Sequence, residues 1–195
     1  MDFTVLRALM GVYDDGATIG ECLRVVQNTK NGDIETFIKE WQLIGNLNLE
    51  RAIIAKDKGD LIRARENYFR ASNYFKSAMI TLNPLDIRHK DFWKLSVDCF
   101  EKAGALLECP MEKIQVELND KTLPCYFIPA KKDKVCPVMF LVTGGEGSNI
   151  EMYFWMRAYA LKNGYSVFWY EGSGNFSIMY TKRTANTGLA KVATQ

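Results

Sequence analysis

The stretch that decides the fold is 138–170, VMFLVTGGEGSNIEMYFWMRAYALKNGYSVFWY. It opens with a continuous apolar run of the kind found in strands that are covered on both faces. A glycine-rich turn follows, and Ser148 to Glu151 then matches the capping box that begins a helix. Gly164 ends this helix, and 165–170 predict another strand. A right-handed crossover makes the two strands parallel, so the stretch predicts the opening of a parallel α/β sheet.

The segment before this unit predicts an antiparallel hairpin. Ile114, Val116 and Leu118 alternate with polar residues, as in a half-buried strand. Residues 119–122 predict a turn, and 123–128 predict the returning strand. The predicted order in this half of the chain is therefore hairpin, strand, helix, strand.

Upstream of about residue 110 the periodicity is helical. Thr18 to Glu21 has the form of a capping box, Asp33 and Asp60 are candidate N-caps, and Gly59 is a natural helix stop. Apolar residues recur at spacings of three and four in each predicted helix. The predicted helices and their apolar faces are 33–58 (Ile34, Phe37, Ile38, Trp41, Ile44), 61–82 (Leu61, Ala64, Tyr68, Ala71, Phe75, Ala78, Leu82) and 91–107 (Trp93, Val97, Phe100, Ala103, Leu107).

The change of periodicity predicts a division of the chain. Residues 1–110 form a helical domain that packs as an antiparallel bundle or hairpin stack. Residues 111–175 form a partial α/β core. The tail, 176–195, is small and polar and carries no predicted structure.

Composition narrows the functional classes. A net charge of +2 gives no electrostatic case for nucleic acid, and no apolar run approaches the roughly 18 residues of a membrane span. The N-terminus shows no signal-peptide pattern. The five cysteines, an odd number without C-x-x-C spacing, support neither a zinc site nor a redox motif, and no metal or cofactor is expected. Free thiols in apolar segments favour a reducing, cytoplasmic location.

The glycine turn at 144–148 joins a buried strand to a helix N-terminus. Amides at such a turn can hold a phosphate or a developing oxyanion. Ser148 stands where a Walker A loop needs lysine, and Ile150 stands where a dinucleotide fingerprint needs its third glycine. A nucleotide-binding βαβ unit is thus a weak alternative, and a plain tight turn remains open.

No complete catalytic set is visible. The sequence has no G-x-S-x-G turn, and Ser173, between two glycines, is favoured as part of a structural turn. The only histidine, His89, lies in the helical half. Its basic neighbours Arg88 and Lys90 lower its expected pKa, and a surface histidine is the favoured interpretation.

An ordered series of short motifs extends over about residues 20–175. The residues are Trp41, Ala52, Gly59-Asp60, Ala64, Tyr68-Phe-Arg-Ala-Ser72, Tyr74-Phe75, Ser96, Cys99-Phe100, Leu123-Pro-Cys-Tyr-Phe-Ile-Pro129, Thr143-Gly-Gly145, Tyr153-Phe-Trp155 and Gly164-Tyr165. This series resembles one group of α/β-hydrolases, which includes the pseudooxynicotine hydrolases and the fermentation-respiration switch esterases.

The resemblance implies an α/β fold in which an N-terminal helical cap precedes the first strands of an α/β-hydrolase sheet, left incomplete. Members hydrolyse esters, amides or carbon–carbon bonds with a Ser-Asp-His triad and no metal. By analogy, the backbone amides of Gly145 or Glu146 would donate to the oxyanion. The chain departs from the group at Glu171-Gly-Ser-Gly-Asn175, where members usually have D-G-P-G-x-G, and the nucleophile, acid and base have no counterparts.

These observations predict a truncated hydrolase that is inactive alone. In that fold the strand at 138–142 lies inside the sheet, so its missing neighbour leaves an apolar edge that invites self-association or a partner. A small-molecule ester or amide substrate is expected only if the missing half is supplied. The alternative is a non-enzymatic interaction module, because the helix pair around Gly59 and Asp60 also resembles tetratricopeptide hairpins, although no 34-residue repeat is present.

Overall fold

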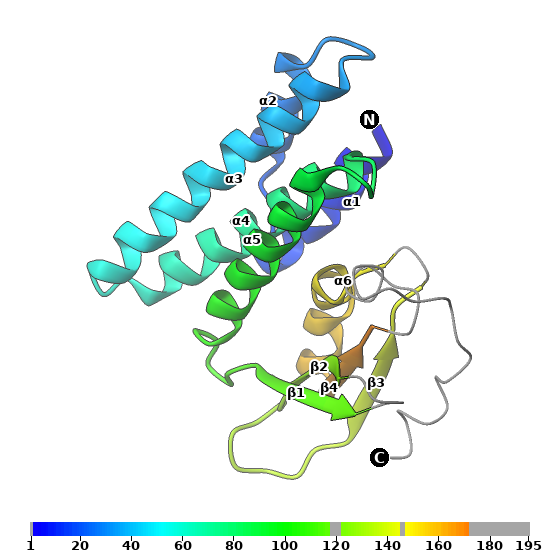
Figure 1. The fold of residues 1–195 in the computed structure, drawn as a ribbon. Coiled ribbons are helices and arrows are strands. Elements are labelled where there is room, and N and C mark those ends of the chain that lie inside the picture. Colours follow the sequence, from blue (N-terminus) through cyan, green and yellow to red (C-terminus); the bar gives the residue numbers. More distant parts are fainter. Residues whose placement is uncertain (1, 118–121, 145–146, 172–195) are drawn as a thin grey trace. The chain divides into compact units, whose positions relative to one another are not determined.

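A computed structural model describes residues 2–117, 122–144 and 147–171 (Figure 1). The chain divides into two compact units, Met1–Leu107 and Glu108–Gln195. The first is helical, and the second contains every strand in the part of the chain that the structure describes.

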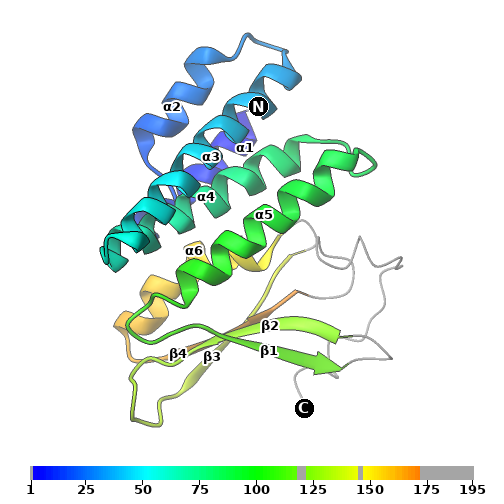
Figure 2. The ribbon, with the colours of Figure 1, turned by 60° about the vertical axis from the view of Figure 1, so that its left-hand side comes forward.

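The first unit is a helical stack whose long helices run alternately up and down (Figure 2). Helix α4 packs against both α3 and α5, so it forms the centre of the unit. The elements are α1 (Asp2–Leu9), the 3₁₀ helix η1 (Met10–Asp14), α2 (Ile19–Asn28), α3 (Ile34–Asp57), α4 (Leu61–Thr81) and α5 (Ile87–Gly104). The sequence reasoning did not predict α1 and η1.

The predicted caps of α3 and α4 are confirmed. Asp33 and Asp60 each accept, through Oδ1, a hydrogen bond from the backbone amide three residues later, at 3.0 Å in both cases. Gly59, between the two helices, has a φ of +77°, which a side chain would disfavour. Local chemistry therefore sets the α3–α4 turn.

The core of this unit is aromatic. Trp41 of α3 and Tyr74 and Phe75 of α4 are fully buried, and the rings of Trp41 and Tyr74 lie 5.7 Å apart. The α3–α4 contact is so close at Gly45 that an added Cβ would lie 2.8 Å from the Phe75 ring. The predicted α4 stripe is buried except at Leu61, which lies at the helix start and is half exposed.

Helix α5 differs from the predicted helix in its bounds and in which of its faces is buried. It begins at Ile87 because Asp86 is the N-cap, accepting from the amide of Arg88 at 2.9 Å. Its buried face contains Phe92, Ser96 and Cys99 as well as the predicted Phe100 and Ala103, whereas Trp93 and Val97 are only partly buried. Small polar residues at the helix contact had made this face difficult to recognise.

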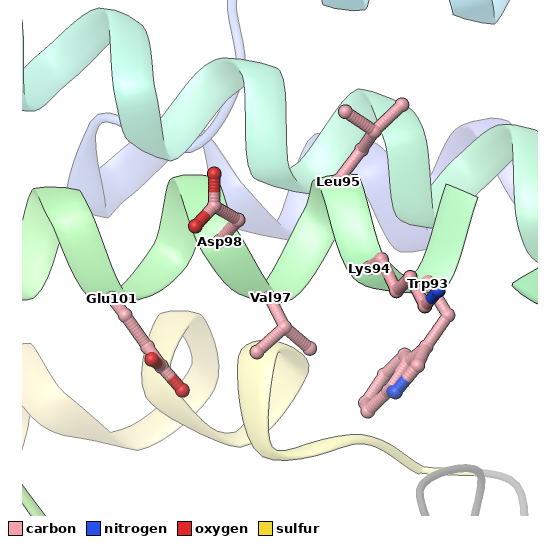
Figure 3. Close-up of a pocket in the computed structure, with 6 residues that line it drawn as sticks. All are labelled: Trp93, Lys94, Leu95, Val97, Asp98 and Glu101. Carbon is pink, nitrogen blue, oxygen red and sulfur yellow. The ribbon is translucent and has the colours of Figure 1, made fainter. Parts of the chain in front are cut away.

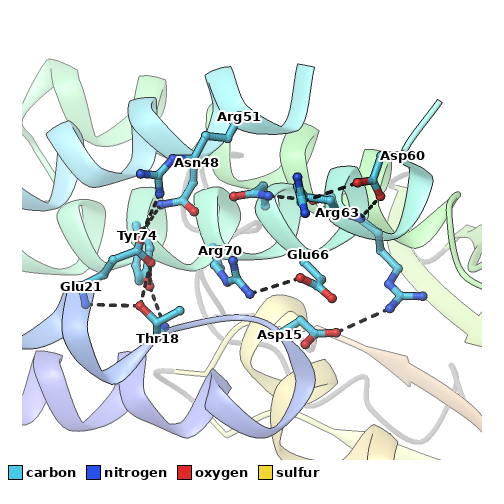
Figure 4. Close-up of polar contacts among 12 residues, drawn as sticks. Asp15, Thr18, Glu21, Asn48, Arg51, Asp60, Arg63, Glu66, Arg70 and Tyr74 are labelled. Atoms are coloured by element: carbon cyan, nitrogen blue, oxygen red, sulfur yellow. Dashed lines mark hydrogen bonds and ion pairs between the residues drawn. The ribbon is translucent and has the colours of Figure 1, made fainter. Parts of the chain in front are cut away.

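A polar network joins helices α2, α3 and α4 of the helical unit (Figure 4). The Glu21 carboxylate of α2 accepts from Tyr74 Oη at 2.7 Å, from Asn48 Nδ2 at 2.9 Å and from Thr18 Oγ1 at 3.0 Å. Arg51 completes the set with an ion pair at 3.3 Å. Only half of the capping box predicted at Thr18 forms, because the Thr18 amide donates to Tyr74 Oη at 2.9 Å instead of to Glu21.

The second unit contains a mixed sheet in the order β1-β2-β4-β3, with β3 and β4 parallel and the other neighbours antiparallel. The parallel β3–β4 pair and the preceding hairpin were both predicted from the sequence and are confirmed. The elements are β1 (Glu112–Glu117), β2 (Thr122–Ile128), β3 (Val138–Val142), α6 (Asn149–Lys162) and β4 (Ser166–Tyr170).

The two faces of this sheet differ. Helix α6 lies on one face, where the Tyr153 and Trp169 rings are 6.3 Å apart (Figure 1). The other face has a small core of Leu123, Cys125 and Tyr170. Toward β3 that face opens, and Val138, Phe140 and Val142 remain 53, 44 and 42% exposed. The prediction of a strand covered on both faces is therefore wrong for β3, because an apolar run does not show what lies over it.

None of the described helices combines enough length with enough apolar character to cross a bilayer.

Candidate functional site

The candidate site is the turn between β3 and α6. Gly147 donates its amide to the carbonyl of Gly144 at 2.9 Å, which closes the turn. A Cβ on Gly147 would lie 3.2 Å from both Gly144 O and Thr143 Cβ, whereas Gly144 has open space around it. Gly145 and Glu146, the predicted oxyanion donors, lie outside the described residues, so their role stays a prediction.

The capping box predicted at the start of α6 is confirmed. Ser148 Oγ accepts from the amide of Glu151 at 3.3 Å, and Glu151 Oε2 accepts from the amide of Ser148 at 3.3 Å. Both side chains are 1% exposed. The box fixes where the helix begins, and therefore where the turn must end.

A second carboxylate reaches the same helix end from β4. Glu171 directly follows the strand, is fully buried, and accepts from the Asn149 amide through Oε1 at 2.6 Å. A carboxylate at a helix N-terminus is favoured by the helix dipole. Sequence reasoning treated Glu171 only as a departure from the hydrolase pattern. Its position at the carboxyl end of a parallel strand was the available signal, because such ends meet at the edge where the crossover helix begins.

Asn149 connects the turn to the rest of the sheet. Its Nδ2 donates to the carbonyl of Pro124 in β2 at 3.2 Å, and its own carbonyl accepts from Trp169 Nε1 in β4 at 3.0 Å. The first residue of α6 is thus held by two strands. These hydrogen bonds hold the start of α6 against β2 and β4.

The chemistry open to this turn follows from which amides are already used. The amides of Ser148, Asn149 and Glu151 each donate to an internal oxygen. These three amides are therefore occupied and are not offered as donors to an oxyanion.

His89 is buried, so the prediction of a surface histidine is wrong. It is 2% exposed in the first turn of α5, inside the helical unit. Burial lowers its pKa, and the nearby Asp86 carboxylate opposes this shift. The predicted direction is confirmed but its cause is desolvation, and tertiary packing decided it. Ser173, the other candidate considered, lies outside the described residues.

Two shallow pockets occur in the helical unit. One runs along α5 (Figure 3), where Trp93, Val97 and Glu101 point to the same side of the helix. The other lies between α3 and α5 beside the Arg88–Glu35 ion pair, whose Nη1 and Oε2 are 2.7 Å apart. Among the described residues, neither pocket is lined by a serine, a cysteine or a histidine. Within the described ranges, no group of three or more His, Cys, Asp or Glu side chains could hold a metal ion.

The helical unit, the glycine turn, the capped crossover helix and the strand order match the N-terminal half of an α/β-hydrolase fold. No protein-family profile matches the chain. The solved structure of 2,6-dihydroxy-pseudo-oxynicotine hydrolase superposes with a TM-score of 0.80 over 96% of this chain and 51% of that one, at 20% identity. This likeness establishes the fold.

Curated relatives extend the likeness to sequence. Hydrolase LUC6 of Fusarium sp. is 33% identical over 180 residues, and the 20-hydroxy-prefusarin hydrolase FUS2 of Gibberella moniliformis is 32% identical over 180 residues. Each alignment covers 89% of this chain and 43% of the relative. The chain is homologous to the N-terminal part of fungal α/β-hydrolases and spans less than half of their length.

Proposed function

We propose that this chain supplies the helical cap and the oxyanion side of a serine α/β-hydrolase, and that these 195 residues are catalytically silent on their own. The carrying observation is the β3–turn–α6–β4 unit, whose turn is held in place by Ser148, Asn149 and Glu171. A glycine turn that leads into a capped helix start, at which the amides of Ser148, Asn149 and Glu151 are already bonded, is suited to presenting other amides to a developing charge.

The relatives support the reaction class. Several carry the word hydrolase in their names, and one is named for 20-hydroxy-prefusarin. For this chain we propose the broader class of ester, amide or carbon–carbon bond hydrolysis, with the backbone amides of Gly145 or Glu146 as donors. Binding and hydrolysis of a substrate would then require the remaining part of a hydrolase sheet.

The proposed lack of activity rests on the catalytic groups that these 195 residues do not contain. The sequence contains no G-x-S-x-G turn and a single histidine. Because His89 is buried in the helical unit, it is not exposed to act as a general base for a solvent-accessible serine.

A fluorophosphonate probe tests this proposal directly. We expect no serine of the chain to be labelled and no turnover of p-nitrophenyl esters, with an active serine esterase as positive control. Labelling of any serine, Ser173 included, would show that the chain carries its own nucleophile.

The oxyanion role needs a complemented sample. The chain would be mixed with the separately expressed C-terminal portion of Hydrolase LUC6, and ester hydrolysis would be followed. If activity appears, Gly145→Pro, which removes the amide hydrogen, should reduce kcat by about 10²–10³-fold when that amide is the donor. Gly145→Ala, which keeps the amide, is the matched control, and the same pair at Glu146 identifies the other candidate.

We also propose a cytoplasmic location for this chain, and its cysteines support it. All five are free, and three of them, Cys22, Cys99 and Cys125, are buried. Imaging of a tagged chain tests this, and accumulation in a secretory compartment would contradict it.

A further inference from the structure

The chain contains two Asn-Gly pairs, and the fold places them in different surroundings. Asn31-Gly32 lies in the turn between α2 and α3, and Asn163-Gly164 follows α6. Asparagine before glycine is chemically labile, because glycine has no side chain to hinder attack of its backbone nitrogen on the asparagine side chain. Each pair is preceded by a lysine. The two pairs therefore offer the same chemistry in two structural settings.

The pair after α6 is held by hydrogen bonds at the groups that deamidation uses. Asn163 Nδ2 donates to the carbonyl of Tyr159 at 2.7 Å, and the Gly164 amide donates to the carbonyl of Leu161 at 3.0 Å. The Asn163 amide donates to the carbonyl of Ala160 at 3.1 Å. Gly164 has a φ of +78°, the left-handed conformation that commonly ends a helix. The attacking nitrogen and the leaving amide group are thus both fixed by the helix end.

The pair between α2 and α3 lacks these constraints. Asn31 and Gly32 are exposed, and in the part of the chain that the structure describes neither the Asn31 side chain nor the Gly32 amide has a hydrogen-bond partner. One hydrogen bond closes the turn, from the Asp33 amide to the Lys30 carbonyl at 3.0 Å. Apart from its chain neighbours, no heavy atom lies within 4 Å of the place where a Cβ on Gly32 would stand. The nitrogen that would attack is therefore open on its outer side.

We propose that Asn31 is a site of spontaneous deamidation in the folded protein, and that the end of α6 protects Asn163. The Gly32 nitrogen forms a bond to Asn31 Cγ, the bond from Cγ to Nδ2 breaks, and Nδ2 leaves as ammonia with the proton of the attacking nitrogen. Water then opens the cyclic imide at either carbonyl and leaves aspartate or isoaspartate at position 31. The reaction needs no oxidant or reductant. It does not depend on the proposed hydrolase role.

The products change the connection between α2 and α3. Each adds a carboxylate close to Asp33, whose own side chain caps α3 by accepting from the Thr36 amide. A negative charge near a helix N-terminus is favoured by the helix dipole, so aspartate is compatible with the fold. Isoaspartate inserts a methylene group into the backbone of the turn, so the bond from Asp33 to Lys30 cannot keep its geometry. The modification therefore acts on the turn between the two helices.

Peptide mass spectrometry of the full chain tests the proposal. The folded chain is kept at mildly alkaline pH and physiological temperature, and samples are digested with pepsin at acidic pH, where the reaction is slow. We expect the peptide with Asn31 to gain the mass of an amide-to-acid conversion at least about tenfold faster than the peptide with Asn163, equivalent to about 1.4 kcal/mol in the barrier. Methyl transfer by an isoaspartate methyltransferase should label the peptide with position 31.

The denatured chain separates the effect of the fold from that of the local sequence. In guanidinium chloride the helix end is lost, so the rate at Asn163 should rise to become similar to the rate at Asn31. Asn31→Gln keeps the amide group and the charge but closes a ring much more slowly. This variant should lose the fast phase of deamidation and leave the rate at Asn163 unchanged.

Three results would overturn the proposal. These are equal rates at the two sites in the folded chain, a difference in rate that persists unchanged in guanidinium chloride, and an Asn31→Gln variant that forms isoaspartate as fast as the parent. Circular dichroism during the incubation shows that the chain stays folded while the rates are measured.

Discussion

The helical unit and the sheet differ in how completely their side chains are covered, as the Glu21 network and the β3 strand show. At Glu21, the carboxylate accepts from Tyr74, Asn48, Thr18 and Arg51, so polar groups at the α2–α3–α4 contact have internal partners. At β3, the side chains of Val138, Phe140 and Val142 remain 53, 44 and 42% exposed. Among the described residues, the helical unit therefore covers its core more completely than the sheet covers its β3 face.

The largest expected effect is on stability, and it is measured by truncating one aromatic residue in each of these two regions. Trp41→Ala removes a fully buried side chain from the α3–α4 core and should lower the free energy of unfolding by about 3–5 kcal/mol. Phe140→Ala removes a ring that is 44% exposed and should cost about 1–2 kcal/mol, mainly its contacts with Phe168 and Tyr170. Urea unfolding at low protein concentration, followed by far-UV circular dichroism, compares them. Equal losses would mean that the β3 face is as well packed as the helical core.

A smaller effect is expected at the network itself. Tyr74→Phe deletes the hydroxyl that donates to Glu21 and accepts from the Thr18 amide. Both partners then lose a hydrogen bond at a part-buried position, so the free energy of unfolding should fall by about 1–3 kcal/mol. Thr81→Val, which removes a hydroxyl that bonds only within α4, is the control. A Tyr74→Phe variant as stable as the parent would show that Glu21 is satisfied without the tyrosine.

Buried thiols should make the helical unit sensitive to alkali. Burial raises the pKa of Cys22 and of Cys99 to about 12, and in Cys22 the Glu21 carboxylate adds to the effect. The unfolded chain loses these protons above about pH 8.5, while the folded chain keeps them. Stability is thus complete below that pH and falls as the pH rises toward 12, by up to about 1.4 kcal/mol per pH unit for each thiol.

Urea titrations at increasing pH measure this slope. Cys22→Ala and Cys99→Ala should each flatten it, whereas Cys136→Ala, at a partly exposed position, should not. An unchanged slope in both buried-site variants would assign the alkaline sensitivity to other groups.

Local rules in the sequence were sufficient for much of the fold. The caps Asp33, Asp60 and Ser148 satisfy amides within the next three residues, so their chemistry can be recognised without knowing the tertiary structure. The parallel direction of β3 and β4 also followed, because two neighbouring strands joined by a crossover helix of this length run in the same direction.

Features that depend on distant partners escaped the sequence reasoning. The Thr18 amide left its predicted partner for Tyr74, which is 56 residues away. Glu171 reached the amide of Asn149, and His89 was buried instead of exposed. In each case the decisive neighbour comes from another element, and no local pattern identifies it.

The sequence alone determined the helical and α/β halves, the capped helices and the glycine turn before α6, since all of these arise from interactions over a few residues. Only the tertiary structure decided that Glu171 accepts from the Asn149 amide at the α6 N-terminus and that Phe140 of β3 stays half exposed. Burial and strand neighbours are set by segments far apart in the chain, and an apolar run such as VMFLV reads the same whether it is covered or exposed.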